Sequence, residues 1–278
     1  MNEIKLVYIV GYGRVGSTLF GNFLAATGGC VNVGEMYKCF FDEDMYQKSL
    51  PCGCGDDLPR CSFWSKVDFD ASSEVRREVG RKVRNRHIFR NFKTYLKNFP
   101  KIKSRFKELN ERLSKCCESN VVVDSSKNPA FLKFLVDLGA EPYVIHLVRR
   151  PSDVIRSWSK SKRYLKKKNI IKTIFDMAYY EYCIKVACKE IARHKKIFVK
   201  YEDFIESPES EIERVAKFIG EPLFISRLED DSFDVPLSHS CAGNPSKLDQ
   251  VGRVTLSKGK SCSRRSLSDV LLGGKYGY

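Results

Sequence analysis

A glycine-rich segment near the N-terminus carries the residues with the clearest chemical potential. Residues 11–18 read Gly-Tyr-Gly-Arg-Val-Gly-Ser-Thr and lie between an apolar run at 4–10 and a segment of helical spacing at 19–24. A strand, a glycine-rich turn and a helix aim backbone N–H groups and the positive end of a helix dipole at one point. The segment is therefore predicted to bind an anion, and its candidate ligands are Gly13, Arg14, Val15, Gly16, Ser17 and Thr18.

Three kinds of phosphate-binding loop share features with this segment. Its glycines fit the dinucleotide fingerprint G-x-G-x-x-G, and Glu35 lies where a ribose-binding acid would follow, but residues 36–118 lack the further strand–helix units of such a fold. The glycine spacing of a nucleoside-triphosphate loop is also present, but Ser17 occupies the position of its lysine. The only cation in the loop is Arg14, which favours a third interpretation built on an arginine.

Other polar residues follow predicted strands further along the chain. Lys127 comes after the apolar run at 121–124, and Arg149 comes directly after the run at 143–148. Ser157 lies eight residues beyond Arg149, in a helix that Pro151 is predicted to begin. Strands that alternate with helices form a parallel sheet, and ligands bind at the carboxyl ends of its strands. These residues are therefore expected at one edge of one sheet.

The motifs resemble those of the sulfotransferase superfamily that uses 3′-phosphoadenosine-5′-phosphosulfate (PAPS), in particular its bacterial and tyrosyl-protein-like branch. Residues 14–19 resemble the 5′-phosphosulfate loop of that family, and Arg149 with Ser157 resembles its 3′-phosphate motif. Arg150 departs from the pattern, because relatives commonly carry Asp or Asn there. Lys127 begins a Lys-x-Pro element whose lysine faces the transferring group in relatives.

Two further matches extend the resemblance toward both ends of the chain. Glu35 follows the loop arginine by 21 residues, which is the position of the general base in the relatives. Residues 239–245 resemble an H-x-x-x-G-N-P element that returns the C-terminal segment to the nucleotide. His239 and Asn244 belong to this element, and Lys247 stands where arginine is usual.

The resemblance implies metal-free, in-line transfer of a sulfuryl group from PAPS to a hydroxyl of a glycan, lipid or small metabolite. Glu35 would be the general base, with His239 as the alternative, while Arg14 and Lys127 would offset developing charge. The nucleotide would be held through Arg149, Ser157, Asn244 and Lys247. Two other functions remain open: a P-loop kinase that uses ATP and magnesium, and a non-catalytic basic module that binds nucleic acid or lipid.

The length and composition suit a single α/β domain over residues 1–278, of which 42% are hydrophobic. We expect a P-loop-like parallel sheet flanked by helices. A basic helical insertion is predicted at about 72–118, broken near Pro100, and a C-terminal segment that covers the cofactor at about 236–278. The first residues lead directly into a strand and no apolar run could span a membrane, so we expect a cytoplasmic protein without an export signal or transmembrane segment.

The net charge of +15 is concentrated in two segments. Residues 72–118 hold 15 Lys or Arg against five Glu, and residues 156–172 hold eight Lys or Arg and no acid. This pattern suits an anionic cofactor, an acidic acceptor or peripheral contact with an anionic membrane, and no specific nucleic-acid partner is expected.

Three of the eleven cysteines are closely spaced. Cys52, Cys54 and Cys61 form a C-x-C-x6-C pattern that supplies three thiols without an evident fourth metal ligand. We expect a glycine-bent loop closed by Phe63 and Trp64 and no bound metal, while zinc and a local disulfide remain alternatives.

Overall fold

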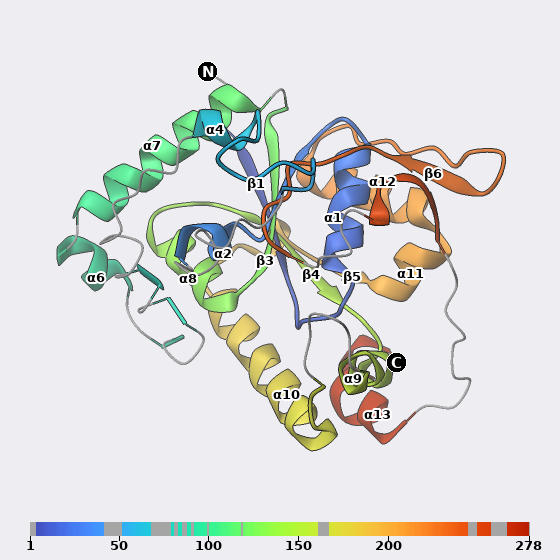
Figure 1. Ribbon diagram of the computed structural model, residues 1–278. Helices are drawn as coiled ribbons and strands as arrows, with labels where there is room; N and C mark the ends of the chain where they lie inside the picture. Colours follow the sequence, from blue (N-terminus) through green and yellow to red (C-terminus); the bar gives the residue numbers. More distant parts are fainter. Residues whose placement is uncertain are drawn as a thin grey trace.

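A parallel sheet forms the centre of the computed structural model. The structure describes residues 4–41, 52–67, 79–80, 83–84, 88–89, 92–98, 100–117, 119–160, 167–243, 249–256 and 266–277. The five strands lie in the order β2-β3-β1-β4-β5 (Figure 1), so β1 is central. Their bounds are β1 Lys5–Val10, β2 Val31–Gly34, β3 Val121–Lys127, β4 Tyr143–Val148 and β5 Lys196–Lys200. The predicted fold class, a parallel sheet flanked by helices, is confirmed.

Alternating side chains of the central strand supply the hydrophobic cores on both faces of the sheet. Val7 and Ile9 belong to one cluster of buried residues, while Tyr8 and Val10 belong to another. Successive side chains of a strand point to opposite faces, so a central strand covered on both sides is apolar at every position. This explains why residues 5–10 read as a continuous apolar run with only one lysine at the start.

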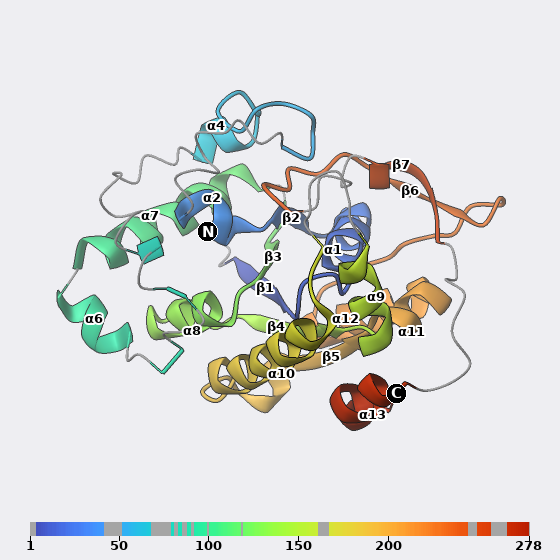
Figure 2. The ribbon, with the colours of Figure 1, turned by 60° about the horizontal axis from the view of Figure 1, so that its bottom comes forward.

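Helices cover each of these faces (Figure 2). Residues of α1 (Ser17–Ala26), α11 (Tyr201–Glu206) and α12 (Pro208–Ile219) join the cluster around Ile9. The opposite cluster includes residues of α7 (Pro100–Cys116), α8 (Pro129–Asp137) and α10 (Ile170–Ala187). The shorter helices in the described part of the chain are α2 (Met36–Phe41), α4 (Trp64–Val67), α6 (Phe92–Asn98) and α9 (Pro151–Ser159).

Local sequence signals explain where several helices begin and end. The side chain of Asn128 accepts hydrogen bonds from the backbone N–H groups of Ala130 and Phe131, and so caps the start of α8. Pro151 and Pro208 occupy first-turn positions, where a missing N–H costs nothing. Gly220 ends α12 in the left-handed conformation that glycine adopts most easily.

The structure has a helix break at the place in the basic segment where the sequence predicts one, near Pro100. Helix α6 ends at Asn98 and α7 begins at Pro100, because proline cannot continue the hydrogen bonding of a preceding helix. Helix α7 buries Ile102, Leu109 and Leu113 and exposes most of its charged residues. Residues 68–78 and several shorter stretches up to 118 lie outside the described residues, so the predicted start of the insertion at 72 remains a prediction.

The C-terminal region adds elements that the sequence did not predict. Strands β6 (Ser232–Val235) and β7 (Gly252–Thr255) form an antiparallel pair, and α13 (Leu267–Gly273) follows. The chain also forms short 3-10 turns at Arg193–Lys195 (η2) and Gly274–Tyr276 (η4). Helix α13 lies next to α9 (Figure 1), where both carboxylate oxygens of Asp269 accept hydrogen bonds from Ser152. None of the described helices has the length and apolar character needed to cross a bilayer.

Candidate active site at the carboxyl ends of the strands

The loop between β1 and α1 adopts a conformation that depends on its glycines. Gly16 has φ +93°, and a Cβ there would lie 2.2 Å from a ring carbon of Tyr201. A Cβ on Gly13 would lie 3.0 Å from the ring of Trp158. Gly16 is also the N-cap of α1, and no side chain among the described residues caps this helix. The first N–H groups of α1 therefore suit an external anion, as the loop interpretation predicts.

Arg14 joins this loop to helix α9. Its Nε donates a hydrogen bond to Oγ of Ser157 over 3.0 Å, and its backbone oxygen accepts one from Nη1 of Arg149 over 3.4 Å. The guanidinium of Arg149 lies over the ring of Tyr201, 4.5 Å from its centroid. The two predicted phosphate motifs, which are more than 130 residues apart in the sequence, are therefore in direct contact.

The side chain of Arg149 is incompletely paired. Its Nε is buried and has no hydrogen-bond partner within the described part of the chain. A buried donor on a charged group is costly to leave without a partner, and the planar guanidinium suits two oxygens of one phosphate. The buried donor of Arg149 and the uncapped start of α1 are two neighbouring anion sites, which we call the phosphate cradles. Together they suit a nucleotide that carries two phosphate groups.

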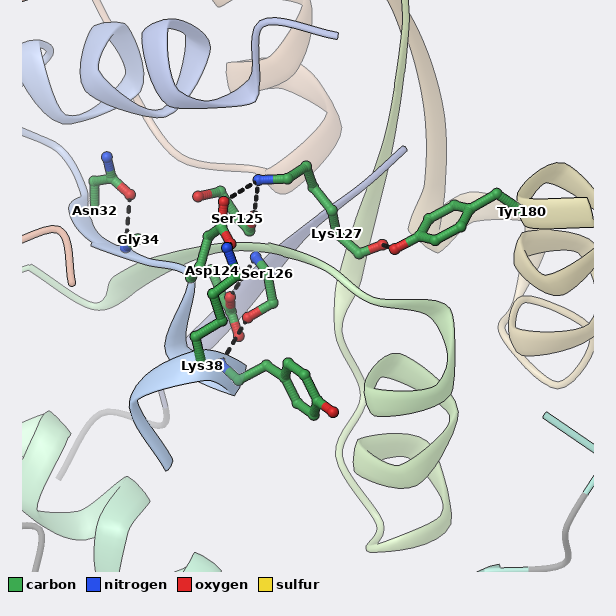
Figure 3. Close-up of polar contacts among 10 residues, drawn as sticks. Asn32, Gly34, Lys38, Asp124, Ser125, Ser126, Lys127 and Tyr180 are labelled. Atoms are coloured by element: carbon green, nitrogen blue, oxygen red, sulfur yellow. Dashed lines mark hydrogen bonds and ion pairs between the residues drawn. The ribbon is translucent and has the colours of Figure 1, made fainter. Parts of the chain in front are cut away.

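Glu35 and Lys127 form the second part of the site. Oε1 of Glu35 lies 2.5 Å from Nζ of Lys127, and Oε2 lies 2.6 Å from Nζ of Lys38 in α2. Figure 3 shows Lys127 and Lys38 reaching this point from different segments of the chain. Burial raises the pKa of Glu35, but the two ammonium groups outweigh burial and hold its pKa below the usual value. The carboxylate is therefore ionised at neutral pH and can accept a proton.

Lys127 itself sits at an unusual backbone position. Its φ is +61°, and its carbonyl accepts a hydrogen bond from the hydroxyl of Tyr180 (Figure 3). Arg14 (φ +77°) and Ala242 (φ +51°) are also non-glycine residues in the left-handed region. Such strain persists where the surrounding structure enforces it, and it occurs often at functional sites. Three of the four non-glycine residues with positive φ in the described structure thus lie in this region.

Asp124 is a buried acid of the site that the sequence interpretation did not select. It is fully buried on β3, and its Oδ1 accepts a hydrogen bond from the backbone N–H of Ser126. Burial raises the pKa of Asp124 to about 7, and the neighbouring charge of Glu35 adds to the rise. An acid at the end of an apolar run was the signal in the sequence, but its complete burial depends on the elements packed around the strand.

The C-terminal segment reaches the site through Cys241 and Gly243. Cys241 donates its N–H to the carbonyl of Val33, and its own carbonyl accepts the N–H of Glu35 over 3.0 Å. A Cβ on Gly243 would lie 3.8 Å from Oε1 of Glu35 and 3.9 Å from Oγ1 of Thr18. This segment therefore contacts both the predicted base and the predicted phosphate loop. The other two candidates of this segment, Asn244 and Lys247, lie outside the described residues.

His239 lies with the cysteines of the 52–61 loop. Its Nδ1 is 3.2 Å from Sγ of Cys61, its ring stacks on Phe63, and its carbonyl accepts a hydrogen bond from Nε1 of Trp64. The sequence interpretation found no fourth ligand for the three thiols, and the structure supplies one from 178 residues further along the chain. This placement makes His239 a weaker candidate for the base than Glu35.

The remaining loop candidates have different positions. Val15 and Ser17 are buried, and Thr18 is partly exposed in the first turn of α1. Val15 belongs to the hydrophobic cluster on the α1 face of the sheet, so it can contribute only its backbone to an anion. Ser17 and Thr18 present hydroxyl groups at the same helix start.

Comparisons with known proteins found a matching family model and solved structures of similar fold. A family model described as "Sulfotransferase domain" matches residues 5–268. A solved structure of the sulfotransferase domain from the curacin biosynthetic pathway shares 14% sequence identity, with a TM-score of 0.58 over 100% of this chain and 99% of that one. The sulfotransferase domain from the Synechococcus PCC 7002 olefin synthase shares 18% identity, with a TM-score of 0.52 over 100% and 96%. A search of curated proteins found no match.

Proposed function

Because the chain belongs to the sulfotransferase domain family, we propose that it transfers a sulfuryl group from PAPS to the hydroxyl of an acceptor. The observation that carries the proposal is the direct contact between the two phosphate motifs through Arg14, Arg149 and Ser157. PAPS has phosphate groups at both its 5′ and 3′ positions, so two adjoining cationic cradles suit it better than a nucleotide phosphorylated at one end. When bound, PAPS supplies an activated sulfuryl group whose leaving group is the 5′-phosphate.

The residues of this chain have separable roles in the proposed reaction. The N–H groups at the start of α1, with Ser17 and Thr18, hold the 5′-phosphate end of the donor. Arg149 and Ser157 bind the 3′-phosphate. Arg14 bridges the two cradles and adds positive charge where negative charge develops on the leaving oxygen.

Glu35 accepts the proton of the acceptor hydroxyl in this proposal. Its carboxylate is ionised and buried, and it is held by Lys127 and Lys38 at 2.5 and 2.6 Å. Lys127 also serves the reaction, because its ammonium lies beside the base and can offset charge on the transferring group. Gly243 lies against Glu35 and Thr18, so the C-terminal segment would help to exclude water from the reacting atoms.

The acceptor is proposed as a hydroxyl group of a glycan, lipid or small metabolite, and the basic composition of residues 72–118 would favour an acidic one. Two other functions would use the same charges differently. An ATP-dependent kinase is disfavoured by Ser17 at the position of the loop lysine. A non-catalytic basic module would need neither the strained loop nor the buried pair of Glu35 and Lys127.

Nucleotide titration tests the proposal. We expect the protein to bind adenosine 3′,5′-bisphosphate more tightly than adenosine 5′-phosphate or ATP with magnesium in calorimetric titrations. Arg149→Ala should weaken the bisphosphate by at least about 30-fold, since removing one partner of a buried charge pair costs about 2 kcal/mol or more. Arg156→Ala in α9, the helix that follows Arg149, is the matched control, because its side chain is 53% exposed and pairs with Asp153.

The comparison that matters is between adenosine 3′,5′-bisphosphate and adenosine 5′-phosphate. A loss of affinity confined to the bisphosphate supports the assignment of Arg149 to the 3′-phosphate. Equal losses of affinity for the two nucleotides would place the 3′-phosphate elsewhere.

Labelled-sulfate transfer from PAPS to a pool of hydroxylated acceptors then tests the reaction itself. Strong binding of ATP with magnesium and none of the bisphosphate would favour a kinase, and steep salt-dependent binding to DNA or vesicles without nucleotide binding would favour a basic module.

A further inference from the structure

Four potential metal ligands converge beside the active site. Sγ of Cys52, Cys54 and Cys61 and Nδ1 of His239 all lie within 4.8 Å of one another. Sγ of Cys61 is 3.6 Å from each of the other two sulfur atoms and 3.2 Å from Nδ1 of His239. Sulfur atoms in a disulfide are about 2.05 Å apart, so these thiols are not cross-linked to one another. The cluster therefore consists of three free thiols and an imidazole.

The spacing agrees with tetrahedral coordination. Zinc binds sulfur at about 2.3 Å and imidazole nitrogen at about 2.0–2.1 Å, which places two sulfur ligands about 3.8 Å apart and a sulfur and a nitrogen about 3.6 Å apart. The sulfur–sulfur distances of 3.6 Å and the sulfur–nitrogen distances of 3.2 and 4.0 Å lie close to these values. We propose that Cys52, Cys54, Cys61 and His239 bind one structural Zn²⁺ ion.

The ligand types favour zinc and a structural role. Soft thiolates with an imidazole in a tetrahedral arrangement select zinc over magnesium or calcium, which prefer oxygen ligands. On binding, the three thiols release their protons to solvent, and each thiolate and the neutral imidazole donates one electron pair to the metal. Zinc keeps its oxidation state, and the centre carries a net charge of −1. Four protein ligands leave no position for water or substrate, so the ion would take no part in sulfuryl transfer.

The surroundings hold the proposed ligands in place. Phe63 stacks on the imidazole of His239 with ring centroids 5.0 Å apart and an interplanar angle of 11°. Nε1 of Trp64 donates a 2.7 Å hydrogen bond to the carbonyl of His239, and the N–H of Gly53 donates to the carbonyl of Ser240. Such contacts around the ligands orient metal-binding side chains in proteins. They also explain why Phe63 and Trp64 follow Cys61 so closely in the sequence.

The metal would connect two distant segments next to the proposed base. Three ligands come from the 52–61 loop, and the fourth comes from the C-terminal segment two residues before Cys241. The carbonyl of Cys241 accepts the N–H of Glu35, and Gly243 lies beside the carboxylate of the same residue. Zinc would therefore hold the C-terminal segment against the active site without touching substrate.

Metal analysis of the full chain tests this proposal without an activity assay. We expect the protein, purified under reducing conditions, to contain about one zinc ion per chain by elemental mass spectrometry. Replacement of zinc by Co²⁺ should produce thiolate-to-cobalt charge-transfer absorption and the intense visible bands of tetrahedral cobalt. Because this measurement uses the unaltered chain, it does not depend on the folding of any variant.

Matched cysteine variants identify the ligands. Cys54→Ser should lower zinc affinity by at least tenfold in competition with a chromophoric chelator, whereas Cys188→Ser should leave it unchanged. Both cysteines are partly exposed, but Cys188 lies outside the cluster. The proposal is overturned if the reduced chain binds neither Zn²⁺ nor Co²⁺, if both variants bind zinc equally well, or if mass spectrometry finds a disulfide among the three clustered cysteines of the purified protein.

Discussion

Replacing Glu35 with glutamine removes one negative charge and leaves the shape of the side chain almost unchanged. The carboxylate lies 2.5 Å from Nζ of Lys127 and 2.6 Å from Nζ of Lys38, and its side chain is only 7% exposed. An amide offers an acceptor to one of the two lysines but presents an NH₂ donor to the other. One ammonium group therefore loses its partner and faces a second donor.

The size of the effect on stability follows from the burial of this pair. At 2.5 Å and an effective dielectric constant of about 20, the attraction between Glu35 and Lys127 is about 7 kcal/mol, and desolvation of the two ions offsets much of it. Removing one partner of a buried pair costs about 3–5 kcal/mol. Lys127 is 14% exposed and keeps a hydrogen bond to the carbonyl of Ser125, so we expect a loss of about 3 kcal/mol in the free energy of unfolding.

The effect on turnover should be larger than the effect on nucleotide binding. Removing a general base lowers the rate of the chemical step by about 10²- to 10⁴-fold. We expect this loss for Glu35→Gln in single-turnover transfer of labelled sulfate, at a temperature where calorimetry shows the variant to be folded. Affinity for adenosine 3′,5′-bisphosphate should stay within about threefold, because the phosphate cradles are formed by other residues.

A matched substitution separates the loss of the base from a general effect of charge. Glu111→Gln makes the same chemical change on α7, where the carboxylate is 57% exposed and lies 4.0 Å from Lys107. It should change stability by less than about 1 kcal/mol and leave turnover unchanged. Turnover of Glu35→Gln within about tenfold of the unaltered protein would refute the assignment of Glu35 as the base. A parallel loss of nucleotide affinity would instead point to a collapsed site.

Two further predictions concern the loop and the buried acid. Gly16→Ala should weaken binding of adenosine 3′,5′-bisphosphate by at least tenfold in calorimetric titration, because the new Cβ would lie 2.2 Å from the ring of Tyr201. Gly28 also has a positive φ, but a Cβ there would have no atom within 4 Å. Gly28→Ala should therefore cost only about 1–2 kcal/mol of stability and leave nucleotide binding intact. Asp124→Asn should remove a pH dependence of the free energy of unfolding. Because the pKa of Asp124 is raised from 3.8 to about 7, the folded state of the unaltered protein keeps a proton that the unfolded state loses. The stability of the unaltered protein should therefore fall by roughly 4 kcal/mol as pH rises from about 4 to above 7. Chemical denaturation across this pH range measures the fall, and identical profiles for the variant and the unaltered protein would contradict it.

Local patterns in the sequence predicted most strands of the sheet and several of the residues that meet at the candidate site. The apolar run at 143–148 is β4 with the same bounds, and the glycine-rich segment does connect a strand to a helix. Strand β3 is longer than the predicted run at 121–124, because beyond Asp124 the polar residue Lys127 also pairs with Val10 of β1. The β6–β7 pair and α13 escaped prediction because short elements have too few residues to establish a period.

Contacts between distant residues were decided by the tertiary structure alone. The strand order places β2, β3, β1 and β4 side by side, so that Glu35 meets Lys127 and Arg14 meets Ser157 at one edge of the sheet. No local pattern carries this information, because strand order depends on how the crossovers pack over the whole sheet.

The same physical distinction applies to the cysteine cluster and to Asp124. The sequence alone determined that three cysteines are close together along the chain and that an acidic residue ends an apolar run. Only the folded chain brings His239 to the thiols from 178 residues away and buries Asp124 completely. Residue type and spacing determine which chemistry is available, whereas the dielectric surroundings and the partner of each group arise from packing between segments that are remote in sequence.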